Sequence, residues 1–351
     1  MSADVFECLA AALDRLPNGF PRTDSGVEMR ILEKIFSPEE AALAGQLTGL
    51  LEPLEAIARR LGSPAEEIRR RLFKLVRRGI VWMDEQEGEV CFRLAPFVVG
   101  IYEAQAELMD HELAHLVEDY FAGGGAQGIM GPQPALHRVV PARKAVKSEW
   151  VLPYDDVRSL LLDAKTFGVQ NCICRLQQEK LGQPCEFPMD MCLYFSQHER
   201  DPRPGDITRE AALAILERSE QIGLVHTVSN VMNGVGYVCN CCACCCGILR
   251  GITAWGIENS VASSNYYAVI DAEFCADCGN CVNRCPMGAI AEGDGHSVVD
   301  RKRCIGCGLC VTGCPNDVAR LERKAEAEIV QPPVDFAAWE RARLQGRGTT
   351  G

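Results

Sequence analysis

The feature that most constrains the fold is a cysteine pattern that occurs twice in the last quarter of the sequence. The two runs are Cys275-x2-Cys278-x2-Cys281-x3-Cys285-Pro286 and Cys304-x2-Cys307-x2-Cys310-x3-Cys314-Pro315. Asp271 and Asp300 lie at matching positions ahead of the runs, which indicates that a unit of about 29 residues has been duplicated. Three thiolates on one tight loop, with a fourth before a proline that turns the chain, form a metal-ligand pattern, so the two runs predict a pair of metal sites.

This spacing resembles that of the bacterial dicluster ferredoxins at all eight cysteines and at both prolines. The resemblance implies a domain over residues 263–325 that binds two [4Fe-4S] clusters, each taking its fourth ligand from the other run. By that resemblance, the first cluster takes Cys275, Cys278, Cys281 and Cys314, and the second takes Cys304, Cys307, Cys310 and Cys285. The alternative is a pair of zinc knuckles, but four zinc ligands in two pairs give no reason for the longer pattern to occur twice.

Ten more cysteines lie in a middle segment, residues 139–262, which we expect to be a separate α+β unit. They are Cys172, Cys174, Cys185, Cys192, Cys239, Cys241, Cys242, Cys244, Cys245 and Cys246. Free thiols at this density would oxidise and exchange, so metal ligation is the favoured interpretation, with iron-sulfur clusters ahead of zinc. Adjacent cysteines do not easily bind one metal atom through both side chains, so we expect some of the last six to face a second centre or to lie near a centre without binding it. We expect Arg175, which lies beside the first of these cysteines, to donate a hydrogen bond to cluster sulfur or to offset thiolate charge.

The composition favours an intracellular metal protein over a secreted disulfide scaffold. The chain has 351 residues, 20 cysteines and a formal net charge of -12. The first residues are acidic and lack the apolar core of a signal peptide, and no stretch approaches the roughly 20 apolar residues needed to cross a bilayer. We therefore expect a cytoplasmic protein without membrane insertion. The net charge also argues against a surface that coats nucleic acid.

The segment over residues 28–97 resembles the winged helix-turn-helix domain. Helix signals start at Ser37-Pro38, at Leu54 and at Ser63-Pro64, and two strands follow within residues 80–94. From Leu54 to Gly79 there are eight basic and three acidic residues, a local net charge of +5. The third helix, which starts at Ser63-Pro64, lacks the Asn or Gln side chains that read bases. We therefore favour docking or bracing slightly over DNA binding.

Residues 98–138 are expected to form a helix from Tyr102 to Phe121 followed by a Gly-rich linker. The helix contains His111-Glu112-Leu113-Ala114-His115, which matches the zincin pattern. No third ligand follows at a suitable distance, so we interpret it as a surface helix that happens to hold two histidines. Residues 326–351 are expected to be an extended tail, and residues 1–27 an N-terminal segment.

Together these features predict an α+β protein with an N-terminal winged-helix-like domain, a cysteine-rich middle unit and a C-terminal dicluster ferredoxin-like domain. The leading hypothesis is an electron-transfer protein or oxidoreductase subunit that works with redox partner proteins. One alternative is a redox-sensing regulator that binds DNA through the winged helix. Another is an iron-sulfur enzyme that acts on a small molecule at a cluster in the middle unit.

Overall fold

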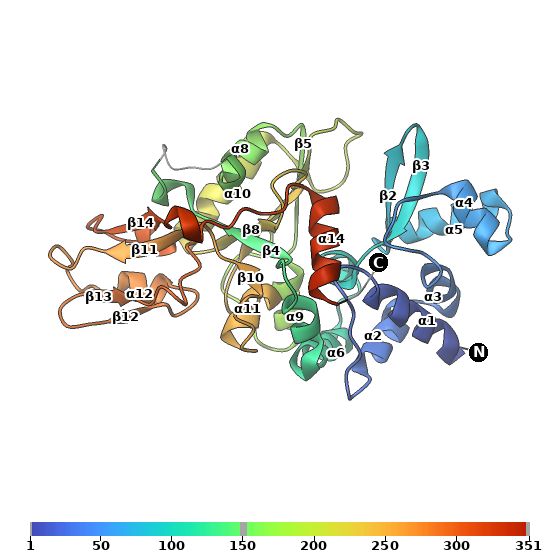
Figure 1. Ribbon diagram of the computed structural model, residues 1–351, viewed down its shortest axis with the longest axis horizontal. Helices are drawn as coiled ribbons and strands as arrows, with labels where there is room; N and C mark the ends of the chain where they lie inside the picture. The colour runs from blue at the N-terminus through green and yellow to red at the C-terminus, as the bar shows by residue number, and fades with distance from the viewer. Residues whose placement is uncertain (1, 148–152, 349–351) are drawn as a thin grey trace. The chain divides into compact units, whose positions relative to one another are not determined.

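The computed structural model describes residues 2–147 and 153–348, and the chain in it mixes helices and strands (Figure 1). Contacts between backbone positions divide it into two compact units. Unit 1 comprises residues 1–132, 176–184 and 341–351, and unit 2 comprises residues 133–175 and 185–340. The middle segment, apart from residues 176–184, therefore belongs to the same unit as the duplicated cysteine runs.

Unit 1 is mainly helical and carries one small sheet. Its helices are α1 (Ser2–Asp14), α2 (Val27–Ile35), α3 (Pro38–Ala44), α4 (Leu54–Leu61), α5 (Ala65–Arg77), α6 (His111–Tyr120) and α7 (Ala126–Met130). The strands β1 (Glu52–Pro53), β2 (Val81–Gln86) and β3 (Glu89–Leu94) pair antiparallel in the order β1-β3-β2. The β2-β3 hairpin follows α5 directly and extends from the body of this unit (Figure 1).

The starts of two helices in unit 1 follow from their capping residues. Ser37 caps α3, because its hydroxyl accepts from the Glu40 amide while the Glu40 carboxylate accepts from the Ser37 amide. Asp110 caps α6 by accepting from the Leu113 amide at 2.8 Å. The prediction of one helix from Tyr102 to Phe121 is therefore wrong, because the strong cap at Asp110 starts a new helix at His111.

Two segments expected to be irregular are helical instead. The Gly-rich stretch after Phe121 contains α7, and the expected tail contains α14 (Phe336–Gly346). In α14, Trp339 donates its indole hydrogen to the Ala135 carbonyl at 3.0 Å. Arg343 is fully buried and donates to the backbone carbonyls of Pro17, Ile129 and Pro132. These buried contacts explain why a sequence with weak helical patterning is ordered here.

Unit 2 is built on a seven-stranded sheet of order β10-β4-β8-β9-β6-β5-β7. The strands are β4 (His137–Val140), β5 (Thr166–Gln170), β6 (Cys192–Ser196), β7 (Asp206–Ile207), β8 (Val225–Ser229), β9 (Tyr237–Cys241) and β10 (Val261–Ala262), antiparallel except for the β10-β4 pair. Helices α8 (Val157–Leu162) and α10 (Arg209–Ile222) pack on the sheet through a core that includes Leu161, Phe167 and Leu216. Helices α9 (Ile173–Lys180) and α11 (Gly247–Thr253) each follow a cysteine-bearing segment.

The duplicated runs fold into two matching halves within unit 2. Strands β11 (Tyr266–Ile270) and β14 (Ala319–Arg323) pair antiparallel, as do β12 (Ile290–Glu292) and β13 (Ser297–Val299), and the short helices α12 (Asn280–Arg284) and α13 (Leu309–Thr312) follow the two loops. Positive φ angles recur at equivalent positions: Asp277 and Gly306, Gly279 and Gly308, and Gly288 and Asp317. The duplication seen in the sequence is therefore also a duplication of backbone conformation.

Candidate metal centres

The eight cysteines of the duplicated runs line two separate spaces. Each space contains about 330 Å³ free of protein atoms, part of which is open to solvent. The cysteines that line the first are Cys275, Cys278, Cys281 and Cys314, and those that line the second are Cys285, Cys304, Cys307 and Cys310. Each space thus receives three cysteines from one run and the fourth from the other.

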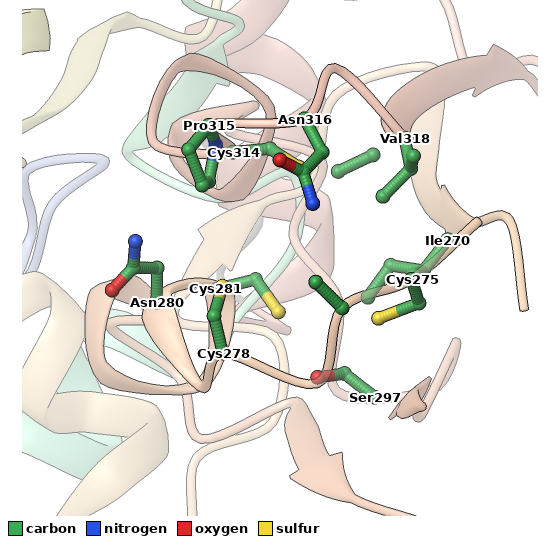
Figure 2. Close-up of a pocket in the computed structure, with 12 residues that line it drawn as sticks. Ile270, Cys275, Cys278, Asn280, Cys281, Ser297, Cys314, Pro315, Asn316 and Val318 are labelled. Atoms are coloured by element: carbon green, nitrogen blue, oxygen red, sulfur yellow. The ribbon is translucent and has the colours of Figure 1, made fainter. Parts of the chain in front are cut away.

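The first space has soft donors on its walls and apolar side chains between them. Figure 2 shows the Sγ atoms of Cys275 and Cys281 pointing into it, with Ile270 and Val318 on the same wall. Pro315 turns the chain directly after Cys314 and also lines the space. Thiolates are the ligands that iron-sulfur clusters require, and apolar walls exclude water, so the residues present fit such a group.

The second space offers hydrogen bonds to sulfur. The Ala268 amide donates to Cys304 Sγ at 3.5 Å, and the Ala289 amide donates to Cys285 Sγ at 3.2 Å. Burial raises the pKa of Cys307 to about 12, so this thiol stays protonated unless a metal offsets the thiolate charge. These contacts suit thiolates that carry a metal centre.

The structure brings four middle-unit cysteines into one compact group. Cys185 Sγ lies 3.7 Å from Cys242 Sγ and 3.5 Å from Cys244 Sγ, and Cys244 Sγ lies 3.7 Å from Cys245 Sγ. All four sulfurs lie within 4.8 Å of one another, and no other group of three candidate ligands in residues 2–147 and 153–348 is as compact. We call this set the four-thiol group, and it can hold a metal centre.

The other six middle-unit cysteines form a closed ring of interactions. Each thiol interacts with two others, in the order Cys172, Cys174, Cys246, Cys241, Cys239, Cys192 and back to Cys172. The six come from the ends of β5, β6 and β9 and from the starts of α9 and α11. We call this set the six-thiol ring.

The run from Cys239 to Cys246 is divided between the two sets. Cys239 and Cys241 lie two apart on β9, which places them on one face of the strand and in the ring. After β9 the chain turns, with the Cys246 amide bonded to the Cys242 carbonyl at 3.1 Å, and this turn contributes to the four-thiol group. We expected adjacent cysteines not to serve one metal easily, but Cys244 and Cys245 both lie in the four-thiol group, because the turn places their sulfurs 3.7 Å apart.

Arg175 lies between the four-thiol group and the six-thiol ring and is fully buried. Its Nη1 donates to the Pro188 carbonyl at 2.8 Å and its Nη2 to the Asn240 carbonyl at 2.7 Å, whereas Nε has no hydrogen-bond partner among the described residues. Burial acts to lower the pKa of Arg175, but the neighbouring Cys172 and Cys242 raise it above its ordinary value. The guanidinium therefore offsets thiolate charge, as expected from the sequence.

Hydrogen bonds connect the six-thiol ring to buried polar residues that the sequence did not single out. Tyr237 Oη lies 2.8 Å from His137 Nε2, His137 Nδ1 lies 3.2 Å from Thr227 Oγ1, and Thr227 Oγ1 lies 3.5 Å from Cys241 Sγ. Burial lowers the pKa of His137 to about 4, so this imidazole is neutral. Only the alternation of polar side chains on β8 and β9 could have indicated this chain of contacts.

The remaining sequence candidates lie apart from these groups. A further histidine, His226, is buried; its Nδ1 lies 2.6 Å from Asn240 Oδ1 and its Nε2 lies 3.5 Å from Glu220 Oε1, so its nearest polar atoms are not thiols. His111 and His115 lie on an exposed face with their Nε2 atoms 3.3 Å apart, and Glu112 binds Lys34 Nζ at 2.6 Å. Within the described ranges, no third ligand joins the two histidines in a compact group.

Comparison with known proteins identifies one part of the chain. Residues 267–315 match the family model described as a 4Fe-4S dicluster domain. No curated protein and no solved structure matches the chain significantly. The matched range covers both cysteine runs, so the protein contains an iron-sulfur dicluster domain. In the described part of the chain, every helix is too short or too polar to cross a membrane.

Proposed function

We propose that this protein transfers electrons through two [4Fe-4S] clusters in the dicluster domain and exchanges them with a further iron-sulfur centre in the six-thiol ring. The observation that carries the proposal is the crossed lining of the two spaces, each with three cysteines of one run and one of the other. That arrangement is typical of ferredoxins whose two clusters lie close enough to exchange electrons. The protein would then serve as a subunit or partner of an oxidoreductase.

The contacts around the spaces support this role. The amide donors at Ala268 and Ala289 stabilise negative charge on sulfur, which favours the reduced state of a bound cluster. Apolar residues such as Ile270 and Ile290 limit access of water to the same spaces. The dicluster domain also packs on the middle unit: the Ala142 amide donates to the Cys307 carbonyl at 2.9 Å, and Ala145 contributes to the same core as Cys310.

The six-thiol ring is the candidate site for the further cluster. It offers more thiolates than one cubane needs, and its members lie less closely together than the four-thiol group. The six thiols suit a cluster larger than a cubane, or a cubane bound by four of them with the other two beside it. Anaerobic protein should therefore contain more than the eight iron atoms of two cubanes.

The crossed ligand sets provide a test of the electron-transfer proposal. Low-temperature EPR of the reduced protein should resolve two interacting clusters. Replacing Cys314 with alanine should perturb the cluster held by the first run, and replacing Cys285 should perturb that of the second. The Cys8→Ser variant is a matched control, because Cys8 is exposed on α1. The proposal fails if the clusters form but accept no electrons from a viologen donor, or if each variant affects only its own run.

We also propose that residues 28–97 form a winged helix used for docking. Four of the six cations on and directly after α5 pair with acids: Arg69 with Glu66, Arg71 with Glu67, and Lys74 and Arg78 with Glu40. The cavity between α4, α5 and the β2-β3 hairpin is lined by Glu55 and Glu89 as well as by Arg69. This mixed charge suits a protein surface better than DNA phosphate.

The DNA-binding alternative can be tested by fluorescence anisotropy on pools of duplex fragments. We expect no saturable binding at about 0.15 M salt, because a few phosphate contacts weaken steeply at that ionic strength. Arg70 and Arg77 are the cations to probe, since the described residues provide neither with an ion pair. Tight, sequence-selective binding that an Arg70→Glu/Arg77→Glu variant loses, and that an Arg69→Glu/Arg71→Glu control retains, would instead support a redox-sensing regulator.

A further inference from the structure

The four-thiol group differs in size from any iron-sulfur cubane site. Its measured Sγ to Sγ distances are 3.5 to 3.7 Å, and all four sulfurs lie within 4.8 Å of one another. Four thiolates around a single tetrahedral zinc ion, each about 2.3 Å from the metal, lie about 3.8 Å from one another. A cubane places four irons between its thiolates and holds their sulfurs about 6 Å apart. The observed distances match the single ion.

The chain segments that supply the four sulfurs also suit a closed site. Cys185 lies in the loop between α9 and β6, and the other three lie in the turn between β9 and α11. Cys242 and Cys245 are buried, and Met191 and Leu224 pack against them. Four protein sulfurs leave no open position on a tetrahedral ion, which is characteristic of structural rather than catalytic zinc.

Arg175 provides a second observation that points to a metal thiolate centre. Four thiolates around a divalent ion carry a net charge of about -2, and burial of that charge requires a cation nearby. Arg175 is buried beside Cys242, and its Nε has no other partner among the residues the structure describes. A guanidinium N-H directed at thiolate sulfur is the usual kind of contact that stabilises such a centre.

We infer that Cys185, Cys242, Cys244 and Cys245 bind one zinc ion, which fastens the loop before β6 to the turn after β9. Zinc does not change its oxidation state, so this site carries no electrons. The inference is independent of the proposed electron transfer, because neither the dicluster domain nor the six-thiol ring supplies a ligand to it. The middle unit thus combines a redox-silent structural site with the ring proposed to hold a cluster.

The test compares metal content and zinc coordination in the full chain. Wild-type protein, purified anaerobically, should contain one zinc per chain, and zinc-edge X-ray absorption should give four sulfur neighbours at about 2.3 Å. The Cys185→Ser/Cys244→Ser variant should lose this zinc and keep its iron and sulfide. These two cysteines are the less buried members of the group, and Cys8→Ser is the matched control.

The outcomes separate this inference from the proposed function. A wild-type protein that lacks zinc, a zinc ion with nitrogen or oxygen neighbours, or a variant that loses iron and sulfide would overturn the inference. The absorption measurement on the wild type decides the question even if the variant folds poorly. EPR signals of the dicluster domain in the same samples report on electron transfer separately, so either idea can fail alone.

Discussion

The dicluster cysteines and the four-thiol group use the same ligand atom but arrange it at different spacings. In the duplicated runs, two or three residues separate successive cysteines, and the cysteines line two separate spaces. In the turn after β9, Cys244 and Cys245 are adjacent, and their sulfurs lie 3.7 Å apart. The spacing of cysteines along the chain therefore affects how closely their sulfurs lie, which composition alone does not indicate.

The largest expected effect comes from removing one thiol from each dicluster space. A Cys278→Ala/Cys307→Ala variant should lose about eight iron and eight sulfide per chain, because each cubane loses a ligand. Zinc content should remain at the wild-type level. Iron, sulfide and zinc analysis measures the content of each. Loss of zinc together with the iron would contradict the distinction between the two kinds of site.

The next largest effect is expected from a substitution at Gly306, which exchanges a residue between the two matching halves of the dicluster domain. Gly306 has a φ of 68°, and a Cβ there would lie 2.1 Å from Ser264 Oγ and 2.3 Å from the Tyr266 carbonyl oxygen. The equivalent residue in the first half is Asp277, so Gly306→Asp inserts the residue of the other half. We expect it to cost more than about 2 kcal/mol in unfolding free energy and to reduce iron content.

Gly288→Asp is the matched control for this substitution. Its φ is 56°, its equivalent is Asp317, and the nearest neighbour of a Cβ there is Arg303 Nη2 at 3.5 Å. We expect a change of about 1 kcal/mol or less. Thermal unfolding followed by circular dichroism, with iron analysis, ranks the two variants. An equal loss of thermal stability in both variants would mean that the two halves do not differ in packing at these positions.

A smaller, more local effect is expected from Arg175→Met. Methionine fills similar volume but leaves the neighbouring thiolates without a buried cation, which should lower stability by about 3 kcal/mol. Zinc should be lost to a chelator faster than from the wild type, whereas the dicluster EPR signals should change little. Arg209→Met is the control, because Arg209 is exposed. Unchanged zinc release would show that Arg175 does not act on the four-thiol group.

No effect is expected at the histidine pair, which tests whether closeness alone makes a metal site. His111 and His115 are as close as the thiols of the four-thiol group, with Nε2 atoms 3.3 Å apart, but they lack a third ligand in the described residues. A Glu112→Gln variant should leave peptidase activity at background, and His111→Ala/His115→Ala should leave zinc content unchanged. Glu112-dependent cleavage of a peptide substrate would contradict this interpretation.

The sequence predicts best what depends on local spacing. The grouping of the eight dicluster cysteines follows from two short runs, and the Ser37 cap with Pro38 at the first helical position starts α3 as expected. The sequence indicates that Cys239 to Cys246 are divided, but it does not indicate which cysteine enters which set, because that depends on where β9 ends and the turn begins. The order of α14 was also missed, because it rests on buried contacts of Arg343 with residues more than two hundred positions away.

The division of Cys239 to Cys246 between the six-thiol ring and the four-thiol group also affects the order in which metals can bind. One peptide bond joins Cys241 of the ring to Cys242 of the four-thiol group, and another joins Cys245 to Cys246. Whichever metal arrives first fixes the backbone between them and so orients three thiols for the second. The metal that arrives first should therefore speed the filling of the other centre during assembly, whereas each centre, once filled, keeps its own ligands.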